Sequence, residues 1–411
     1  MEASGVKRTM SAGFTLGCLV VGSCGGGDGS SVPSVQVGDS AGVRIVDISG
    51  YANLDLPEWT IEEVYSSVEG PEFTTIVDAA FVADSILVVA DQGSSQVTFL
   101  NDRGAVITRA GRRGSGPGEY TDIGRFGVGA DDSLFVFDRR EQRLTMLATD
   151  GTALRVERID LGGRYLPYEP LTRLPNGGFL AALETRALVP AGLHRAPFFL
   201  VRTNEDGQVA DTLGRWEGKE FFATEDGNQW LPVGFARTAV YAGRGRRTAV
   251  GTTDSLDITV WDGAQVSHRI RGRTDPKPVA REERERWIER YIEPWPDVAR
   301  ASARTRIEQS QIRDNYPAYG ALAIDADGRL WVGAYARLTD LQRVWTVFGN
   351  DGRPIGRVNL PAYHARAVEV ENSIPGFRTH ELLDVRGNRV AVVRVDAFDV
   401  QYVTVFAIAE H

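Results

Sequence analysis

The chain has few residues that carry thiol, metal or polyanion chemistry. Its two cysteines, Cys18 and Cys24, both lie near the N-terminus, so the rest of the chain forms no disulfide and has no thiol chemistry. It has five histidines, and its three lysines are Lys7, Lys219 and Lys277. The net charge of −9 argues against a nucleic-acid partner, because neutralising phosphates requires a basic surface.

Several motifs of known catalytic classes are also missing. The chain contains neither G-x-S-x-G nor H-E-x-x-H, which leaves nucleophilic hydrolases and zinc proteases without support. The segment Gly111–Tyr120 is rich in glycine but lacks the G-K-[ST] ending of a phosphate-binding loop. The segment Asp325–Gly328 resembles the beginning of a calcium loop, yet the later ligands and the final Glu are absent. We interpret both segments as turns.

The N-terminal segment has the layout of a secretory signal. Lys7 and Arg8 precede the apolar run Met10–Val21, which is too short for a membrane-spanning helix of about 20 apolar residues. Residues 21–24 resemble the bacterial lipobox, which implies that Cys24 is lipidated and becomes the new N-terminus. We predict a signal peptide over residues 1–23, a lipidated Cys24 with a flexible tether through residue 42, and a membrane-anchored location in the cell envelope. Ordinary signal cleavage is the alternative.

A repeated strand–turn–strand unit dominates the remaining sequence. Asp-Gly between apolar strands is a strong hairpin signal, because a type I′ turn needs positive φ at its central residues. Five turns of this or a near-equivalent kind are Asn101–Gly104, Asp150–Gly151, Asp206–Gly207, Asp262–Gly263 and Asp351–Gly352. A second series of six turns lies upstream of these, one in each predicted blade. The spacing between successive turns of a series approaches the roughly 40–50-residue period of a propeller blade. We therefore predict an all-β, six-bladed β-propeller over residues 43–411.

Two further features complete the predicted fold. The last blade ends after its third strand, Tyr402–Ile408, and Trp59–Tyr65 can supply the missing outer strand, so that the two ends of the chain close the ring. Charged residues and a helical apolar stripe over Ala280–Ile292 predict a helix that ends at Pro294. A second helix begins near Asp297, which gives a helical insertion at about 278–313 between blades 4 and 5.

The segment Gly111–Tyr120 carries a family resemblance. It is similar to the G-x-x-G-x-G-P-G-E-aromatic stretch of bacterial six-bladed propellers of the NHL-repeat and TolB-like superfamily. The resemblance covers roughly residues 43–409. It implies a scaffold used mainly for binding, with a minority of lyases and lactone hydrolases.

The long segments between strands indicate the binding face. Links from the fourth strand of one blade to the next blade, and from second to third strands, emerge on the same face of a propeller. That face receives every long segment, and such an excess of loops is typical of a binding surface. The segments are Arg109–Ile123, Leu183–Pro197, Gly214–Phe235, Gly272–Ala318, Pro361–His380 and Val395–Val400.

We predict from this pattern a non-catalytic, monomeric scaffold that needs no cofactor. Its expected partners are the membrane, through the anchor, and an envelope protein, peptide or glycan. The candidate binding residues lie on the loop-rich face: Arg112, Arg113, Arg125, Arg139, Arg140, Arg173, Trp287, Tyr291, His364 and His380.

Other roles remain open for several of these residues. Asp138 and Arg143 match the D-x-x-x-x-R pattern with which NHL-like blades brace their turns, which leaves Arg139 and Arg140 for an anionic partner. Trp287 either faces a ligand or packs on the blades. The alternative function is a metal-dependent lyase or lactone hydrolase, which requires convergence of at least three ligands at the axis. The candidate ligands are His194, His364, His380, Glu119, Asp122 and Glu381.

Overall fold

The computed structural model describes residues 33–82, 85–129, 133–159, 168–175, 177–184, 189–225, 230–337, 339–362, 381–396 and 400–411. The chain divides after Ser31, and the fold below belongs to the unit Val32–His411. The predicted signal peptide with Cys24, and the candidates His364 and His380, lie outside the described residues. No described helix is long and apolar enough to cross a membrane.

Successive segments of the chain form antiparallel sheets, which are the blades of the fold. Blade 1 contains β4 (Ile76–Val82), β5 (Ile86–Asp91), β6 (Gln96–Leu100) and β7 (Val106–Ala110). Blade 2 contains β8 (Ile123–Val128), β9 (Leu134–Asp138), β10 (Arg143–Leu147) and β11 (Ala153–Arg158). Blade 3 contains β12 (Tyr168–Arg173), β13 (Phe179–Glu184), β14 (Gly192–Thr203), β15 (Val209–Ala223) and a short fifth strand, β16 (Trp230–Pro232).

The second half of the chain repeats this arrangement. Blade 4 contains β17 (Ala239–Arg244), β18 (Arg247–Thr252), β19 (Leu256–Asp262) and β20 (Gln265–Gly272). Blade 5 contains β21 (Ala321–Ile324), β22 (Leu330–Gly333), β23 (Gln342–Phe348) and β24 (Pro354–Pro361). Blade 6 contains β25 (Leu382–Arg386), β26 (Arg389–Val395), β27 (Gln401–Ala409) and, from the N-terminal side of the chain, β3 (Glu58–Ser66).

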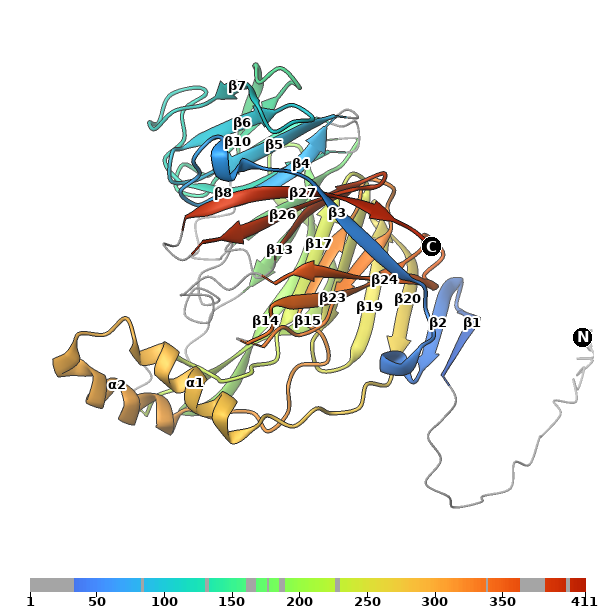
Figure 1. The fold of residues 1–411 in the computed structure, drawn as a ribbon, viewed down its shortest axis with the longest axis vertical. Helices are drawn as coiled ribbons and strands as arrows, with labels where there is room; N and C mark the ends of the chain where they lie inside the picture. Colours follow the sequence, from blue (N-terminus) through green and yellow to red (C-terminus); the bar gives the residue numbers. More distant parts are fainter. Residues whose placement is uncertain are drawn as a thin grey trace, which may run out of the picture. The chain divides into compact units, whose positions relative to one another are not determined.

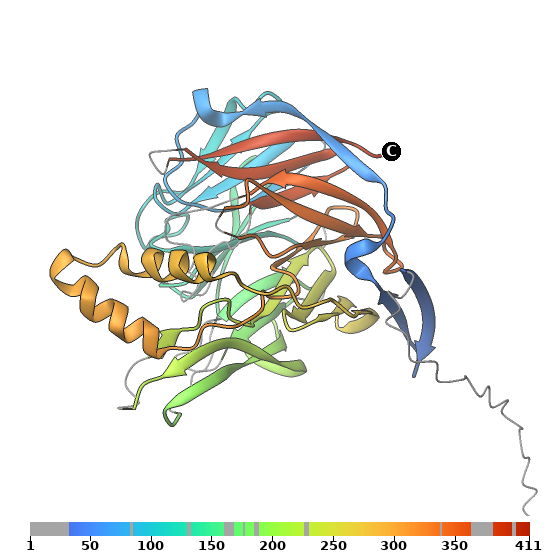
Figure 2. The same ribbon diagram turned by 60° about the horizontal axis from the view of Figure 1, so that its bottom comes forward.

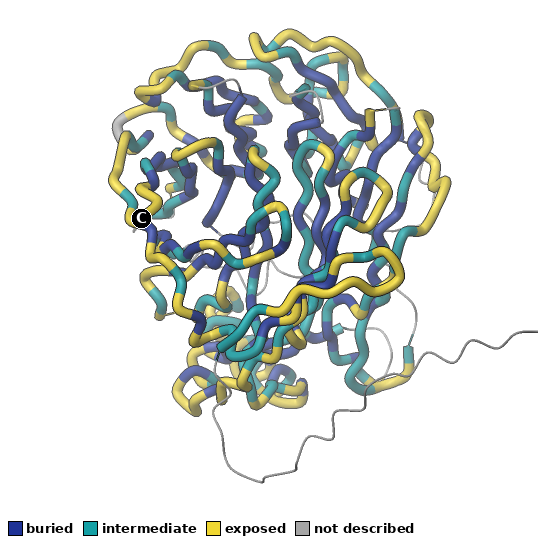
Figure 3. Tube along the Cα trace, turned by 90° about the vertical axis from the view of Figure 1, so that its right-hand side faces the viewer, coloured by how far each residue is buried: buried dark blue, intermediate teal, exposed yellow. Residues whose placement is uncertain are grey.

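The first strands of the blades make a closed ring. Each contacts the next in the order β4, β8, β12, β17, β21 and β25, and β25 contacts β4 again. The glycines of the five predicted hairpin turns all have positive φ, between 59° and 87°. Most of the buried residues lie in the strands (Figure 3), whereas the outer strands β7 and β11 are largely exposed. The fold is a six-bladed β-propeller.

The ring closes through the N-terminal strand, as the sequence predicts. Strand β3 pairs antiparallel with β27, from Thr404 opposite Ser66 to Ala409 opposite Thr60. It also pairs in parallel with β24, with Val358 opposite Trp59, so the sheets of blades 5 and 6 are continuous. The short 3-10 helices Tyr51–Asn53 and Ser67–Glu69 flank β3.

Part of the predicted tether is a β-hairpin. Strands β1 (Ser34–Ser40) and β2 (Val43–Ser49) pair with each other, and β2 pairs in parallel with β20 on the outside of blade 4. The prediction that the tether reaches residue 42 is therefore wrong for Ser34–Ser40. Most of β1 is exposed, and its alternation of apolar and polar residues is limited to Val35 and Val37 and stops at Gly38, so backbone pairing holds the strand.

The predicted helical insertion is confirmed between blades 4 and 5. It consists of α1 (Arg281–Ile292) and α2 (Asp297–Gln309), which stand apart from the sheets on the side away from β1 and β2 (Figures 1 and 2). Two other predicted long segments, Leu183–Pro197 and Gly214–Phe235, are largely strand. They form the extended ends of β14 and β15, which are paired as far as Gly192 opposite Ala223. Three register shifts along this pair obscure the strict alternation of a strand, which explains the difference.

Candidate binding site

The innermost strands carry polar residues toward the axis of the ring. The third residue is polar in four of them: Asp78 in β4, Arg125 in β8, Tyr241 in β17 and Asp384 in β25. A charged or phenolic residue at the third position of a largely apolar inner strand is the sequence signal for this group. Of these four residues, only Arg125 is among the candidates predicted from the sequence.

Arg125 links three blades. Its Nη1 lies 3.5 Å from Oδ2 of Asp78 in blade 1 and 3.0 Å from Oε1 of Glu169 in blade 3. The hydroxyl of Tyr241 in blade 4 donates to Oε2 of Glu169 at 2.8 Å. Burial, and then the charge of Glu169, raises the pKa of Tyr241 well above its ordinary value, so the phenol remains a hydrogen-bond donor. Four successive blades are thus joined by buried polar contacts.

A second group crosses the axis near the opposite end of the inner strands. Arg244 Nη1 lies 2.7 Å from Oδ2 of Asp384 in blade 6, and its Nη2 donates to the carbonyl of Phe81 in blade 1 at 3.1 Å. Asp384 also accepts the backbone N–H of Phe81 at 2.7 Å. The next residue, Gly245, donates its N–H to the carbonyl of Val128 in blade 2 at 3.1 Å. The first turn of blade 4 therefore reaches across the channel and narrows it here.

The channel carboxylates already have partners. Asp78 and Glu169 contact Arg125, and Asp384 contacts Arg244. Within the described residues, no group of three or more His, Cys, Asp or Glu side chains is arranged to hold a metal ion. The metal-dependent alternative stays a prediction, because His364 and His380 lie outside those residues.

The other carboxylates considered for that alternative lie in separate contacts. Glu119 accepts from Arg112 Nε and from the N–H of Gly116, both at 2.8 Å, and that backbone bond is the main cause of its lowered pKa. Asp122 binds Arg139. Glu381 is fully buried and accepts from Trp345 Nε1 at 2.6 Å.

Several candidate arginines are occupied by local ion pairs. Arg139 binds Asp122 through two nitrogens, at 3.0 and 3.2 Å, so the prediction that it is available to an anionic partner is wrong. Arg173 donates to Glu157 at 3.2 Å. Arg112 is paired with Glu119, although its side chain is 78% exposed. Each of these arginines lies beside an acidic residue in the folded structure. The spacing of residues along the sequence does not reveal these ion pairs.

Two candidate arginines remain exposed. Arg113, in the long link between blades 1 and 2, and Arg140, between β9 and β10, have no side-chain partner among the described residues. The neighbouring Asp138 is fully buried and accepts the N–H groups of Thr121, Arg140 and Glu141, whereas Arg143 donates to the carbonyl of Ser115. The structural interpretation of Asp138 and Arg143 is confirmed.

The aromatic stripe of the insertion packs inward. Trp287 is 2% exposed and lies in a cluster with Phe235, Ile288 and Ile307. Tyr291 is partly buried and stacks on Trp287, with ring centroids 6.1 Å apart. Trp287 is therefore part of the core that fixes the helices, and it is not available as a ligand contact.

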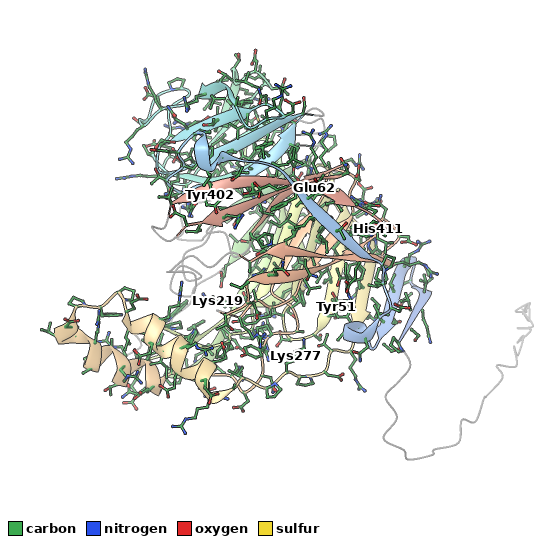
Figure 4. The ribbon with its side chains drawn as sticks, viewed as in Figure 1. Tyr51, Glu62, Lys219, Lys277, Tyr402 and His411 are labelled. Carbon is green, nitrogen blue, oxygen red and sulfur yellow. The ribbon has the colours of Figure 1, made fainter. Side chains whose placement is uncertain are left out.

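A polar pocket lies between blade 3, blade 4 and the return from α2. It has a volume of about 330 Å³ and is lined by Glu220 of β15, Arg237, Asp254 and residues 311–315. Lys219, the neighbour of Glu220, lies on the side of the helices, whereas His411 lies on the side of β1 and β2 (Figure 4). The sequence analysis missed this pocket, because its residues come from four separate segments.

Known proteins give the following comparisons. A family model described as a 6-bladed beta-propeller matches residues 71–161, which contain strands β4 to β11. No curated protein matches the chain.

Solved structures resemble the chain at low identity. A candidate exported protein of Bacteroides fragilis is 12% identical, with 89% of this chain and 100% of that chain covered and a TM-score of 0.47. A gluconolactonase of Xanthomonas campestris is 14% identical, with 87% and 96% covered and a TM-score of 0.36. A virginiamycin B lyase of Staphylococcus aureus is 9% identical, with 85% and 100% covered and a TM-score of 0.39. None of these likenesses indicates what this chain binds.

Proposed function

We propose that the protein is a monomeric, membrane-anchored binding scaffold outside the cytoplasm, related to propellers of the NHL-repeat and TolB-like superfamily. It recognises an envelope protein, peptide or glycan through its loop-rich face and performs no catalysis. The observation that carries this proposal is the unequal construction of the two faces. The helical insertion, the extended β14–β15 pair, the polar pocket, and the exposed Arg113 and Arg140 all belong to one face.

The opposite face consists of tight turns in the described residues. The turns at Gly104, Gly151, Gly207, Gly263 and Gly352 connect paired strands directly. Insertions that accumulate by neutral drift are expected in the loops of both faces, whereas selection for binding lengthens the loops of one face. The pairing of the channel carboxylates with Arg125 and Arg244 also favours a bracing role for them over a catalytic one.

Charge reversal on each face tests the binding role. The Cys24→Ser chain, which has no lipid anchor, is sedimented with isolated envelopes. In this background the double variant Arg113→Glu with Arg140→Glu is compared with Arg103→Glu with Arg353→Glu, two exposed arginines in turns of the other face. We expect the first variant to lose binding and the second to keep it. Equal loss in both variants, or no binding by the Cys24→Ser chain itself, contradicts the proposal.

The anchor requires a separate test. We expect radioactive palmitate to label the unaltered chain and to leave Cys24→Ser unlabelled and released from membranes. Unlabelled but cleaved wild-type chain would instead indicate ordinary signal cleavage. Metal analysis of the purified protein addresses the lyase or hydrolase alternative, which requires a stoichiometric divalent ion and a fall in melting temperature when the ion is chelated.

A further inference from the structure

The wall of the polar pocket is fixed by backbone hydrogen bonds. The segment after α2 pairs with Gly234 on one side, through Gly234 N–H to Gln311 O at 3.1 Å and Arg313 N–H to Gly234 O at 3.0 Å. On the other side, Val279 donates to Asp314 O at 2.8 Å and Tyr316 donates to Lys277 O at 2.9 Å. Binding to such a wall costs little ordering of the chain.

A buried carboxylate forms the floor of the pocket. Glu220 is 1% exposed and accepts the N–H of Arg237 at 2.8 Å. It also accepts two hydrogen bonds from Arg313, from Nε at 3.0 Å and from Nη2. Glu220 and Arg313 therefore neutralise each other, and the second carboxylate, Asp254, accepts two bonds from Arg195 at 2.8 and 2.9 Å.

Arg237 remains a cation without a carboxylate partner. Its side chain donates to two backbone carbonyls, Phe235 O at 3.3 Å and Asn315 O at 3.0 Å, and it forms no ion pair with a described residue. Burial is the main cause of its lowered pKa; the nearby carboxylates of Glu220 and Asp254 oppose this shift, and Arg313 and Arg195 add to it. A guanidinium that is oriented and partly desolvated in this way is stabilised by an incoming anion.

The other lining residues define what accompanies the anionic group. Gln311 and Asn315 carry amides, Ile312 is the one apolar residue of the lining, and the carboxylate of Asp314 pairs with Arg284 Nη2 at 2.7 Å. Such a surface suits hydroxyl groups, which both donate and accept hydrogen bonds. The volume of about 330 Å³ is sufficient for a six-carbon acid and exceeds what a simple inorganic ion fills.

We propose that this pocket binds a sugar carboxylate of the hexuronate class, with its carboxylate on Arg237 and its hydroxyls on Asn315 and Gln311. The proposal rests on the binding role proposed above and names the ligand for one part of the loop-rich face. The acid could be a free uronate or the terminal uronate of a glycan, since both present the same carboxylate and hydroxyls.

Calorimetric titration of the mature chain with glucuronate, glucose and inorganic phosphate tests the proposal. We expect glucuronate to bind at least tenfold more tightly than either of the others. A charge-assisted hydrogen-bonded pair contributes roughly a ten- to hundredfold difference in affinity, so Arg237→Gln should weaken glucuronate binding by about that factor. Arg246→Gln, an exposed arginine paired with Asp262 outside the pocket, is the matched control and should leave binding unchanged.

Two further variants separate binding from folding. Arg237→Lys keeps the charge without the planar fork and should bind with intermediate affinity. Gln311 is exposed, so Gln311→Ala should fold normally and lose affinity severalfold. Equal binding of glucose, tighter binding of phosphate, no glucuronate binding, or unchanged binding by Arg237→Gln each overturns the proposal. A uronate-terminated oligosaccharide that binds more tightly than glucuronate identifies a glycan end as the ligand.

Failure of this proposal can be told apart from failure of the proposed function. One result is that envelope binding depends on Arg113 and Arg140 and yet is unchanged by Arg237→Gln and by excess glucuronate. That result rejects the proposed pocket ligand and leaves the proposed binding role standing. Loss of the difference between the two faces removes the binding role itself.

Discussion

The buried pair of Asp384 and Arg244 gives a pH-dependent term that can be measured. The side chain of Asp384 is 3% exposed, and burial raises its pKa from 3.8 to about 6 despite the opposing charge of Arg244. The folded state therefore holds this proton more tightly than the unfolded state. Stability is lost as pH rises from about 4 through 6, and a shift of about two units corresponds to about 3 kcal/mol.

The variant Asp384→Asn removes this term, because the amide does not titrate in that range. Denaturant unfolding of both proteins between pH 4 and pH 7 gives the test. We expect the free energy of unfolding of the variant, minus that of the unaltered protein, to rise by about 3 kcal/mol over this interval. Other titrating groups cancel in the difference.

Arg244→Met provides the opposite perturbation. It removes the cation that opposes burial, so the pKa of Asp384 should rise beyond 6 and the loss of stability should extend to higher pH. Breaking a buried pair from one side costs about 3–5 kcal/mol at pH 8, where the carboxylate remains without its partner. Parallel pH profiles for the unaltered protein and Asp384→Asn would refute the reasoning.

Two more perturbations follow from the structure. His268 is 2% exposed, and burial lowers its pKa from 6.5 to about 4. Its contribution to stability is therefore lost as pH falls from 6.5 to about 4, which corresponds to about 3 kcal/mol of unfolding free energy. Calorimetric melts of His268→Gln over this pH range should not show this part of the loss of stability. A Cβ at Gly356 would lie 2.4 Å from Trp59, so Gly356→Ala should destabilise by about 1–3 kcal/mol and lower the melting temperature. Gly38, where a Cβ meets nothing within 4 Å, is the control, and an equal shift in Gly38→Ala would contradict the close-packing argument.

The fold could be predicted because its signals are local and repeated. Four Asp-Gly turns and the near-equivalent turn Asn101–Gly104 each place a glycine of positive φ within a few residues of two apolar strands. The residue before each glycine does not have positive φ, so the prediction of type I′ geometry is wrong although the hairpins form. The closing strand could be found because the last blade is visibly short. Strand β1 was missed because backbone pairing with β2 holds it, whereas its alternating apolar residues, Val35 and Val37, are too few to identify a strand.

The candidate site was predicted less well because its contacts join distant residues. Arg125 and Glu169 are far apart in the sequence, as are Arg244 and Phe81, and only ring closure brings them together. Arg139 appeared available because nothing in its immediate sequence shows that Asp122 lies opposite. Which residues lie on the loop-rich face could be deduced from the sequence, whereas whether a charge already has a partner depends on the folded loops.

The two ends of the channel therefore differ in what they can admit. At one end, Arg244 and Gly245 cross the axis to contact blades 1, 2 and 6, and each contact satisfies a buried backbone or carboxylate group. A ligand that entered there would have to displace those partners and leave Asp384 buried without its cation. No such cost applies on the loop-rich face, where Arg237 has no carboxylate to give up. The arrangement of ion pairs inside the ring therefore agrees with the proposal that a ligand binds on the loop-rich face.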